Sequence, residues 1–330
     1  MPSPEYIRQL FDSFSGLTVT VAGDIMADTY IEGKVERISP EAPVPVVEVV
    51  NRYTRPGGAG NVAINLQALG AKVNLCAITG TDPAGKNLTG LLADAGINTK
   101  YVFGSSERST TSKTRILGNH MQMLRVDEEQ THFLSAADEA ECLTRLRQSV
   151  AESQALLFED YDKGYLTEAL VAEGTRLALE KDIPVTVDPK IRRFLGYPGV
   201  TLFKPNLKEL RTGLQISVDA RNAADLKKAS EALRQKLKHR YTLITLSEHG
   251  VYGEEAEADF LLPAHLRNIA DVSGAGDTVI AVATLCLAAG ADFRFTAALA
   301  NLAGGMACEH PGVVPVNKDH LLREALALLV

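Results

Sequence analysis

The sequence is poor in the residues that build disulfides and transition-metal sites. Its four cysteines have no C-x-x-C spacing, and its seven histidines form no H-E-x-x-H or similar pair. We therefore expect buried free thiols and no metal centre built on cysteine or histidine. The cysteines are Cys76, Cys142, Cys286 and Cys308.

Long apolar runs and an excess of positive charge are also lacking. The longest nearly apolar run, residues 279–291, is too short to span a bilayer and fits a buried core helix. The first residues, MPSPEYIRQLFDSF, contain neither a basic nor an apolar export segment, so we expect a cytoplasmic protein. A formal net charge of −7 disfavours a nucleic-acid partner, because binding to phosphates requires a basic face.

What the sequence does have is an alternation of β-branched runs with helical segments. In a chain of 330 residues with 45% hydrophobic residues, this predicts one large α/β domain with a mostly parallel sheet covered on both faces. Ligands of such sheets bind at the carboxyl ends of the strands. The predicted strands are residues 17–24, 72–80, 155–160, 183–188, 199–206 and 241–247, and the predicted helices include 60–69, 136–150, 167–181 and 223–237.

One segment departs from this alternation. The stretch YIEGKVERISPEAPVPVVEVV contains Pro40, Pro43 and Pro45, which suit an edge strand and exclude a central one. The run HMQMLRVD could pair with it. We predict a small β lid inserted into the α/β domain, formed by residues of about 29–50 and 112–127. The alternative is that PEAP is a polyproline ligand for another protein.

The stretch SGAGD places two glycines and an acid at the start of an apolar helix. Glycines there let backbone N–H groups approach an anion, and the helix N-terminus favours negative charge, so Gly274, Ala275 and Gly276 form a candidate phosphate cradle. Asp277 would then be placed as a base. The alternative is a tight turn in which Asp277 only complements the helix dipole.

Two further glycine patterns could bind a nucleotide. GAGNVA, residues 58–63, fits the dinucleotide pattern, but it does not directly follow its strand. GTDPAGKN, residues 80–87, approaches a P-loop, yet Asn87 lacks the hydroxyl that binds Mg²⁺ and Pro83 removes an N–H donor. The alternative for the second pattern is a helix start capped by Asp82.

Several motifs occur together in order: PGGAGNVA at residues 56–63, KPNLKE at 204–209 and DVSGAGDT at 271–278. With them the chain resembles, over essentially its whole length, the ribokinase-like (phosphofructokinase-B) family of carbohydrate kinases. The resemblance implies a three-layer α/β/α fold and a kinase that uses ATP and Mg²⁺. It also implies that the backbone amides of the SGAGD segment hold the γ-phosphate and that Asp277 accepts the proton of the acceptor hydroxyl.

By the same resemblance, Asn206 and Glu209 help to hold Mg²⁺, with water between them and the ion. Their alternative is an ordinary helix N-terminus with Asn206 as the cap and Glu209 closing a capping box. Nucleotide contacts are expected from Lys190, Ser247, Gly250 and Asn301, together with the cradle glycines. The family often carries G-x-x-G-[TA] where this chain has EHPGVVPV. The sequence therefore does not predict the detailed structure of the adenine pocket or whether a monovalent cation binds there.

Substrate contacts are expected from the N-terminal half. Carboxylates accept sugar hydroxyls, glycines allow close approach of the backbone, and an asparagine amide both donates and accepts. A phosphate on the sugar would need cations. The predicted sugar contacts are Asp24, Asp28, Gly57, Gly58 and Asn61, and the predicted phosphate contacts are Lys163 and Arg125. Asp28 could instead cap the following segment, and Arg125 could form a surface ion pair with Asp127 or Glu128.

Within the family, the stretches RISPEAPVPVVEV, VAGDIMADTYI, FEDYDKG and VDPK resemble the subgroup that phosphorylates D-glycero-β-D-manno-heptose 7-phosphate at its C1 hydroxyl, a step toward ADP-heptose and lipopolysaccharide. Such kinases are often fused to a nucleotidyltransferase, whose H-x-G-H motif is missing here, so we expect the kinase half alone, with a separate nucleotidyltransferase possible. The exposed edge of the lid predicts a homodimer.

Three alternatives remain open from the sequence. The first is a kinase of the same family for another sugar or sugar phosphate, such as fructose 6-phosphate. The second is an NAD-dependent oxidoreductase built on GAGNVA, and the third is a sugar-phosphate sensor without catalysis, which the intact GAGD segment disfavours.

Overall fold

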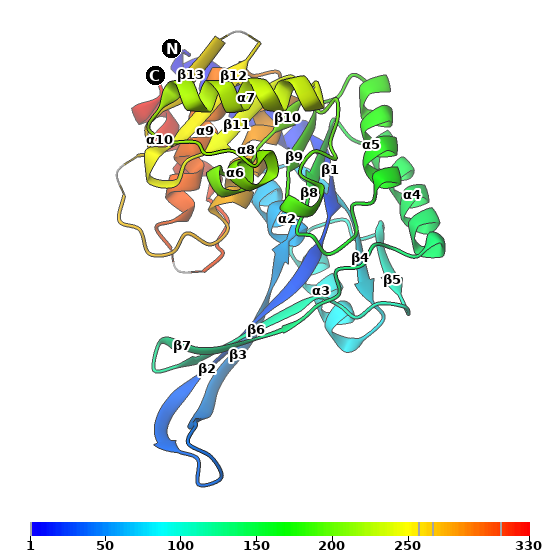
Figure 1. Cartoon of the computed structure of the whole chain (residues 1–330), viewed down its shortest axis with the longest axis vertical. Helices are drawn as coiled ribbons and strands as arrows, with labels where there is room; N and C mark the ends of the chain where they lie inside the picture. Colours follow the sequence, from blue (N-terminus) through cyan, green and yellow to red (C-terminus); the bar gives the residue numbers. More distant parts are fainter. Residues whose placement is uncertain (1, 257, 266, 311) are drawn as a thin grey trace.

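The computed structural model describes residues 2–256, 258–265, 267–310 and 312–330. In this part of the chain, the body is built on a nine-stranded sheet with the order β13-β12-β11-β10-β9-β8-β1-β4-β5 (Figure 1). In this order, every neighbouring pair from β11 to β5 is parallel, and the β11–β12 and β12–β13 pairs are antiparallel. The strands are β1 (Thr18–Gly23), β4 (Lys72–Gly80), β5 (Val102–Ser105), β8 (Ala155–Glu159), β9 (Val185–Asp188), β10 (Leu202–Phe203), β11 (Tyr241–Thr245), β12 (Val251–Glu255) and β13 (Ala258–Leu262).

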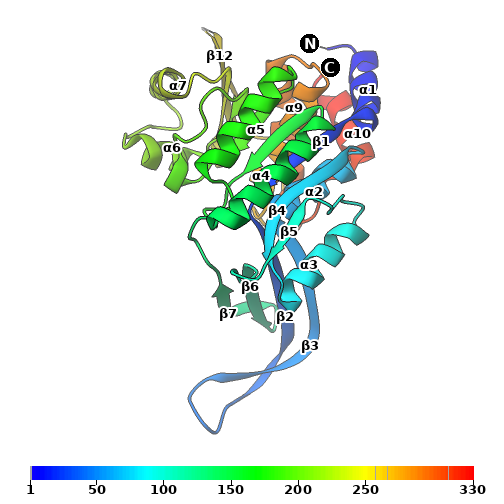
Figure 2. The same ribbon diagram turned by 90° about the vertical axis from the view of Figure 1, so that its right-hand side faces the viewer.

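Helices cover both faces of this sheet (Figure 2). One core packs under α1, α2, α8, α9 and α10, and a second core packs under α4, α5, α6 and α7 on the opposite face. This is the predicted three-layer α/β/α fold. The helices are α1 (Pro4–Ser13), α2 (Ala59–Ala68), α3 (Pro83–Asp94), α4 (Ala136–Ala151), α5 (Glu168–Glu180), α6 (Leu207–Leu214), α7 (Ala223–Leu237), α8 (Ala275–Ala288), α9 (Phe293–Ala307) and α10 (Lys318–Leu328).

A second sheet of four strands extends from the body as a lid (Figure 1). Its order is β3-β2-β6-β7, so β3, which begins at Pro45, is an edge strand as its prolines predict. The expectation that HMQMLRVD pairs with the proline-containing strand is wrong. That run forms β7, which pairs with β6, and β2 separates β6 from β3. The lid strands are β2 (Ile25–Ile38), β3 (Pro45–Gly58), β6 (Ser112–Gly118) and β7 (Met121–Glu128).

The strand register gives the lid two different faces. Asp28 is opposite Arg55 and Tyr30 is opposite Tyr53 in β3. These side chains share one face with Arg115, which we call the inner face because Arg55 contacts the body there. Since successive side chains alternate, the other, outer face carries Ile31, Ile116, Leu124 and Val126. The lid therefore has a polar and aromatic inner face, and its outer face carries several apolar side chains.

Helix ends follow their local sequence closely. Helices α4, α5 and α7 lie within one residue of the predicted ends, and their N-caps are Ser135, Thr167 and Asn222. Strand β10 is much shorter than predicted, and the β12–β13 hairpin was not predicted. None of the helices in the described residues combines the length and the apolar character that crossing a bilayer requires.

Candidate active site

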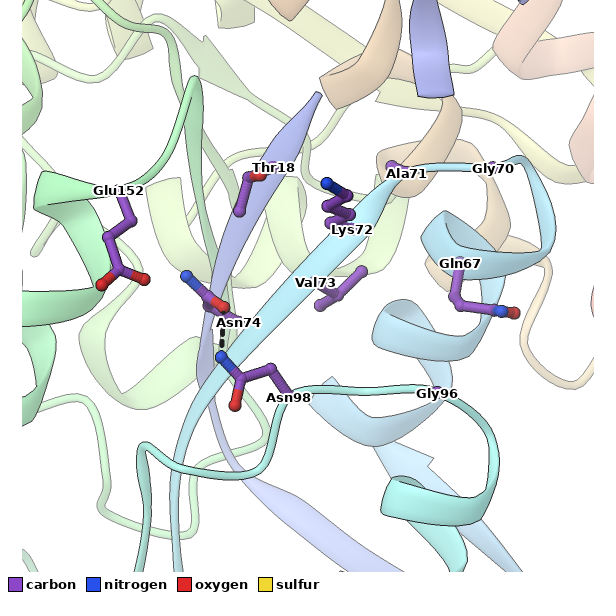
Figure 3. A pocket seen from close by; sticks show the side chains of 10 residues that line it. All are labelled: Thr18, Gln67, Gly70, Ala71, Lys72, Val73, Asn74, Gly96, Asn98 and Glu152. Atoms are coloured by element: carbon purple, nitrogen blue, oxygen red, sulfur yellow. Dashed lines mark hydrogen bonds between the residues drawn. The ribbon is translucent and has the colours of Figure 1, made fainter. Parts of the chain in front are cut away.

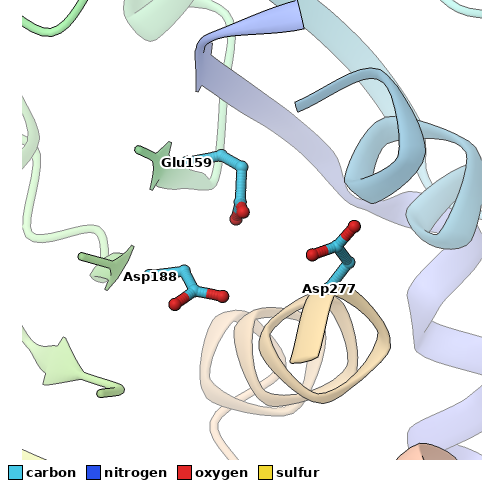
Figure 4. A group of neighbouring side chains, drawn as sticks. All are labelled: Glu159, Asp188 and Asp277. Atoms are coloured by element: carbon cyan, nitrogen blue, oxygen red, sulfur yellow. The ribbon is translucent and has the colours of Figure 1, made fainter. Parts of the chain in front are cut away.

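Three buried carboxylates meet at the carboxyl edge of the main sheet. Glu159 is the last residue of β8, Asp188 is the last residue of β9, and Asp277 lies in the first turn of α8. One oxygen of each lies within 4.8 Å of the other two, and Figure 4 shows the side chains pointing toward one another. The cluster lies at the edge where the parallel sheet predicts a ligand site.

Asp277 is fixed by two donors from distant parts of the chain. Asn61 Nδ2 donates to Asp277 Oδ2 over 2.5 Å, and the Tyr161 hydroxyl donates to Oδ1 over 3.0 Å. Burial raises the pKa of Asp277 to about 6, the hydrogen bonds from Asn61 and Tyr161 oppose the rise, and the charge of Asp188 adds to it. A carboxylate with a pKa near neutrality is suited to act as a general base.

The turn before α8 leaves its backbone open to an anion. Gly274 is the N-cap residue with φ of +78°, a left-handed conformation that favours glycine, and no side chain caps the helix. A Cβ added to Gly276 would lie 3.6 Å from Lys204 Nζ, so an ammonium group stands beside the first turn. Ala275 N makes a long hydrogen bond, of 3.4 Å, to the carbonyl of Val272. The amides of the first turn, which no side chain caps, the helix dipole and a lysine together make this turn a candidate phosphate site.

Two lysines partly compensate the acidic cluster. Lys204 Nζ lies 2.8 Å from Asp188 Oδ2 in a pair that is buried on both sides. Lys190 Nζ lies 3.1 Å from Glu209 Oε1 and 4.8 Å from the centre of the Tyr161 ring. Burial disfavours the charged form of Lys190, but the charges of Asp188, Glu209 and Glu159 outweigh it and raise the pKa of Lys190. The predicted nucleotide contact Lys190 therefore lies beside the site.

Glu159 is the least compensated acid of the cluster. It is fully buried, and in the described part of the chain neither of its carboxylate oxygens has a hydrogen-bond partner. Burial, followed by the charges of Asp188 and Asp277, raises the pKa of Glu159 well above its usual range. Buried polar groups are normally paired, so two orphaned oxygens beside two further carboxylates fit a divalent cation that prefers oxygen ligands.

Asn206 and Glu209, the predicted Mg²⁺ contacts, form a capping box at the start of α6. Glu209 N donates to Asn206 Oδ1 and Asn206 N donates to Glu209 Oε2, each over 2.8 Å. The other oxygen of Glu209 accepts the hydrogen bond from Lys190. Asn206 and Glu209 thus form the capping box that the sequence left open as their alternative role. Glu209 also pairs with Lys190, which lies beside the acidic cluster.

The predicted sugar contacts lie around the junction of lid and body. Asp24 Oδ2 accepts hydrogen bonds from the backbone N–H groups of Tyr161 and Lys163, and its Oδ1 accepts one from Tyr165, each over 2.9 to 3.0 Å. Burial, aided by the charge of Asp160, raises the pKa of Asp24 to about 6. Asp24 thus holds the loop after β8 in place.

Asp28 is paired with Arg115 Nη1 over 2.6 Å on the inner face of the lid. Gly57 and Gly58 lie beside Asp28 and Asp24, where a larger side chain would be crowded. A Cβ on Gly57 would collide with the Asp28 carboxylate, and Gly58 has φ of +60°. Asn61, the remaining predicted sugar contact, instead donates to Asp277 with its amide nitrogen.

The two predicted phosphate contacts both form ion pairs, and Lys113 pairs with the acidic partners of both. Lys163 Nζ lies 2.8 Å from Glu129 Oε2 at the base of the lid, with a largely buried side chain. Arg125, on β7, donates with Nε and Nη2 to Asp127 over 2.8 and 2.9 Å and is half exposed. The pairing with Asp127 is the alternative left open by the sequence.

The predicted nucleotide contacts of the C-terminal half lie near the β11–β12 turn. Ser247 begins the turn with φ of +53°, and Gly250 ends it with φ of +87°, where a Cβ would collide with the backbone of Leu262. Asn301 Nδ2, in α9, donates to the carbonyl of Pro263 over 2.8 Å and so holds the segment after β13.

The two competing glycine patterns serve other purposes. GAGNVA follows β3, a lid strand outside the main sheet, so it is no dinucleotide turn, and its Asn61 belongs to the site. Asp82 caps α3 by accepting a hydrogen bond from Gly85 N over 2.8 Å, as the alternative for the second pattern predicts. Lys86 is exposed on that helix.

Sequence reasoning missed several members of the site. Glu159, Tyr161 and Asp188 lie in the quoted stretches FEDYDKG and VDPK, and Lys204 begins KPNLKE. The available signal was the acidic residues at the ends of the predicted strands 155–160 and 183–188, since neighbouring parallel strands bring their carboxyl ends together. Asn65, which accepts a hydrogen bond from Thr278 Oγ1 over 3.1 Å and so joins α2 to α8, had no such signal.

A depression of about 520 Å³ lies at the amino ends of β1 and β4 (Figure 3). Thr18, Lys72 and Asn74 line it, and Asn98 Nδ2 donates to Asn74 Oδ1 over 2.7 Å. Because the acidic cluster lies at the carboxyl ends of the strands, this depression is at the opposite edge of the sheet and takes no part in the site.

Comparison with known proteins agrees with the fold and shows the family. Residues 17–319 match the pfkB family of carbohydrate kinases, and the chain belongs to this family. It is therefore an ATP-dependent sugar kinase, and the oxidoreductase and sensor alternatives are not supported.

Two relatives and two solved structures show how far the similarity extends. The chain is 40% identical over 307 residues to the bifunctional protein HldE of Methylobacillus flagellatus, covering 93% of this chain and 62% of that protein. It is 41% identical over 306 residues to the bifunctional protein HldE of Coxiella burnetii, covering 92% and 63%. The chain thus spans a little less than two thirds of the length of these relatives.

The solved structures are more distant in sequence and establish the ribokinase-like fold. Phosphofructokinase-2 from Escherichia coli, in complex with potassium, has a TM-score of 0.77 at 19% identity and covers 95% of this chain and 99% of its own. The ribokinase from Arabidopsis thaliana, complexed with ribose and ATP, has a TM-score of 0.71 at 18% identity and covers 93% and 99%.

Proposed function

We propose that this kinase phosphorylates D-glycero-β-D-manno-heptose 7-phosphate at its C1 hydroxyl to give the 1,7-bisphosphate. The observation that carries the chemistry is the position of Asp277, a buried carboxylate in the first turn of α8, beside amides that no side chain caps. The choice of a heptose is supported by the stretches RISPEAPVPVV, GDIMAD and DYDKG, and by identities near 40% to relatives that share the name HldE.

Residues of this chain supply the proton transfer and the charge. Asp277 accepts the proton of the C1 hydroxyl as the oxygen attacks the γ-phosphorus of ATP, and the bond from that phosphorus to ADP breaks. Asn61 and Tyr161 orient the carboxylate with their hydrogen bonds. The amides of the α8 turn and Lys204 stabilise the negative charge of the transferring group, because preorganised donors are most effective in a site that excludes water.

We propose Glu159 and Asp188 as the groups that hold Mg²⁺ or its waters, with Asn206 and Glu209 as the more distant candidates. The orphaned oxygens of Glu159 support this choice, while the oxygens of the capping box already have partners. When bound, Mg²⁺ would neutralise charge on the phosphates of ATP. A monovalent cation near the segment after α9 stays a prediction.

The sugar is proposed to lie between the inner face of the lid and the acidic cluster. Asp24, Asp28, Gly57 and Gly58 border this region, and Lys163 supplies the cation for the 7-phosphate. ATP is proposed to lie over the α8 turn with its base toward Ser247, Gly250 and Asn301. Arg125, which is half exposed and paired with Asp127, is the weaker choice as a phosphate contact.

The decisive assay compares heptose 7-phosphate with fructose 6-phosphate, fructose 1-phosphate and ribose at equal concentration. We expect the highest kcat/KM for heptose 7-phosphate and little activity on the unphosphorylated heptose. If one of the other three is the better substrate, the heptose assignment is wrong, and the alternative of a kinase for another sugar or sugar phosphate replaces it.

We also propose a homodimer formed through the lid. Its outer face exposes Leu124 by 55% and Val126 by 44%, and Ile31 and Ile116 lie on the same face. Exposed apolar side chains beside the edge strands β3 and β7 favour association with a second copy around a two-fold axis. A nucleotidyltransferase that acts later in the same route is the further partner that this function predicts.

A further inference from the structure

Arg55 is the residue through which the lid reaches the loop beside α8. It lies on the inner face of β3, and its guanidinium carbon is 5.2 Å from the centre of the Tyr53 ring. Its Nη1 donates to the carbonyl of Val313 over 3.1 Å. The neighbouring acid on this face, Asp28, is paired with Arg115, so the hydrogen bond of Arg55 is directed to the body.

Residues Gly312 and Val313 contact the α8 turn on their other side. Gly312 N donates to Asp271 Oδ2 over 2.9 Å, and Asp271 Oδ1 accepts hydrogen bonds from the backbone and the hydroxyl of Ser273 over 2.9 and 2.8 Å. A Cβ on Gly274 would lie 3.2 Å from Val313 Cγ1. The two residues therefore brace the turn that precedes the phosphate site.

The backbone at Gly312 is adapted to the arginine. Its φ is +72°, a conformation that L side chains rarely adopt, and a Cβ there would lie only 2.9 Å from Arg55 Nη1. The conformation of the backbone thus favours a glycine, and the missing side chain leaves room for the guanidinium group. Arg55 of the lid and the loop residues Gly312 and Val313 are therefore in close contact.

We propose that Arg55 is a positioning residue that couples the lid to the phosphate site. From the lid it holds Gly312 and Val313 against residues 271–274, and it thereby fixes the amides of the α8 turn where they meet the transferring phosphate. The phosphate site is then complete only when the lid lies against the body. Misplacement of such donors by about 1 Å is expected to cost on the order of 100-fold in rate. This inference rests on the role proposed above for the α8 turn.

The test compares Arg55→Met with Arg52→Met. Methionine keeps an apolar stem beside the tyrosines but removes the donor and the charge, and Arg52 is exposed on the outer face of the same strand. We expect kcat to fall at least about 10-fold in Arg55→Met with the KM for ATP within about twofold, which is the signature of an interaction made in the transition state. Arg52→Met should match the wild type. Equal kcat in the two variants overturns the proposal.

Two further measurements separate positioning from a general loss of structure. Without substrates, the amides of Gly312 and Ser273 should exchange hydrogen faster in Arg55→Met than in Arg52→Met. Combining Arg55→Met with Asp271→Asn should cost less than the product of the two single losses, because both act on the same loop. Unchanged exchange or fully multiplicative losses contradict the proposal.

The controls cover an unfolded variant and a failure of the proposed function. If Arg55→Met lowers the unfolding temperature by several degrees, Arg55→Lys, which keeps one donor, takes its place and should have an intermediate kcat. An active Asp277→Asn variant would refute the proposed base. The hydrogen-exchange comparison needs no substrate, so it would still test whether Arg55 holds the loop.

Discussion

Asn61 and Asp277 are 216 positions apart in the sequence, yet the amide of Asn61 donates a hydrogen bond of 2.5 Å to the carboxylate of Asp277. This contact joins α2, which directly follows the lid, to α8, which begins at the candidate phosphate site. The two glycine-rich motifs of the sequence therefore form one site. The predictions below follow from that arrangement.

Replacing Asp277 tests the proposed base. Asp277→Asn keeps the size of the side chain but cannot accept the proton, so kcat should fall by about 10²- to 10⁴-fold while the KM for ATP changes little. Lys86→Ala is the control, because Lys86 is exposed on α3. Retention of more than about a tenth of the rate by Asp277→Asn would rule out the base, and a collapse in Lys86→Ala would restore the P-loop alternative.

The pH profile should report the pKa of Asp277. Because this pKa is about 6 and the base must be ionised, kcat/KM should be level above this pH and fall about tenfold per unit below it. Tyr161 donates a hydrogen bond that lowers the pKa, so Tyr161→Phe should move the acid limb to higher pH. Steady-state rates between pH 5 and 9 measure both. A limb that moves to lower pH in Tyr161→Phe would contradict the assignment.

Glu159 should destabilise the ligand-free protein at high pH. Its pKa is raised in the folded state, so below about pH 4 the carboxyl is protonated in both states and carries no penalty. As the pH rises, the unfolded chain releases the proton more easily, and the folded protein loses stability. Glu159→Gln should therefore be about 1–3 kcal/mol more stable than the wild type at pH 8, with a difference that vanishes toward pH 4.

Urea unfolding at several pH values measures this difference, and Glu248→Gln is the control because its side chain is 78% exposed. Adding Mg²⁺ should stabilise the wild type more than Glu159→Gln if this carboxylate helps to hold the ion. A Glu159→Gln variant that is less stable than the wild type at pH 8 without Mg²⁺ would show that the carboxylate has a stabilising partner.

Lys163 is expected to bind the phosphate of the sugar substrate. Removing a charge-assisted hydrogen bond in Lys163→Ala should raise the KM for heptose 7-phosphate about 10- to 100-fold, with little change in the KM for ATP. Lys113 provides a matched control, because it also pairs with Glu129, at 3.2 Å, but comes from the lid strand β6. Equal effects of Lys163→Ala and Lys113→Ala would mean that the lysines act only through Glu129.

The apolar outer face of the lid should hold the dimer together. Leu124→Lys places a charge on this face and should shift the protein toward monomers in sedimentation at micromolar concentration. Arg125→Ala, the next residue, lies on the inner face and should leave the assembly unchanged. A wild type that is strictly monomeric with full activity would refute the dimer.

Local features of this protein were determined by the sequence itself. The alternation of strands and helices predicted the layers, Asp82 and Asn206 marked the starts of α3 and α6, and Gly274 marked the open turn before α8. These features depend on hydrogen bonds within a few residues and on the conformational freedom of glycine, so nearby sequence is sufficient to specify them.

Only the tertiary structure decided the surroundings of the reacting groups. It placed the orphaned carboxylate of Glu159 beside Asp188 and Asp277, it gave Asp277 the hydroxyl of Tyr161, and it separated β7 from β3. These relationships depend on the order of strands in the sheet and on burial far from water, which raises the pKa of Asp277 to about 6. The order of strands and the burial cannot be read directly from the sequence, because each such contact joins segments that meet only when the whole core has packed.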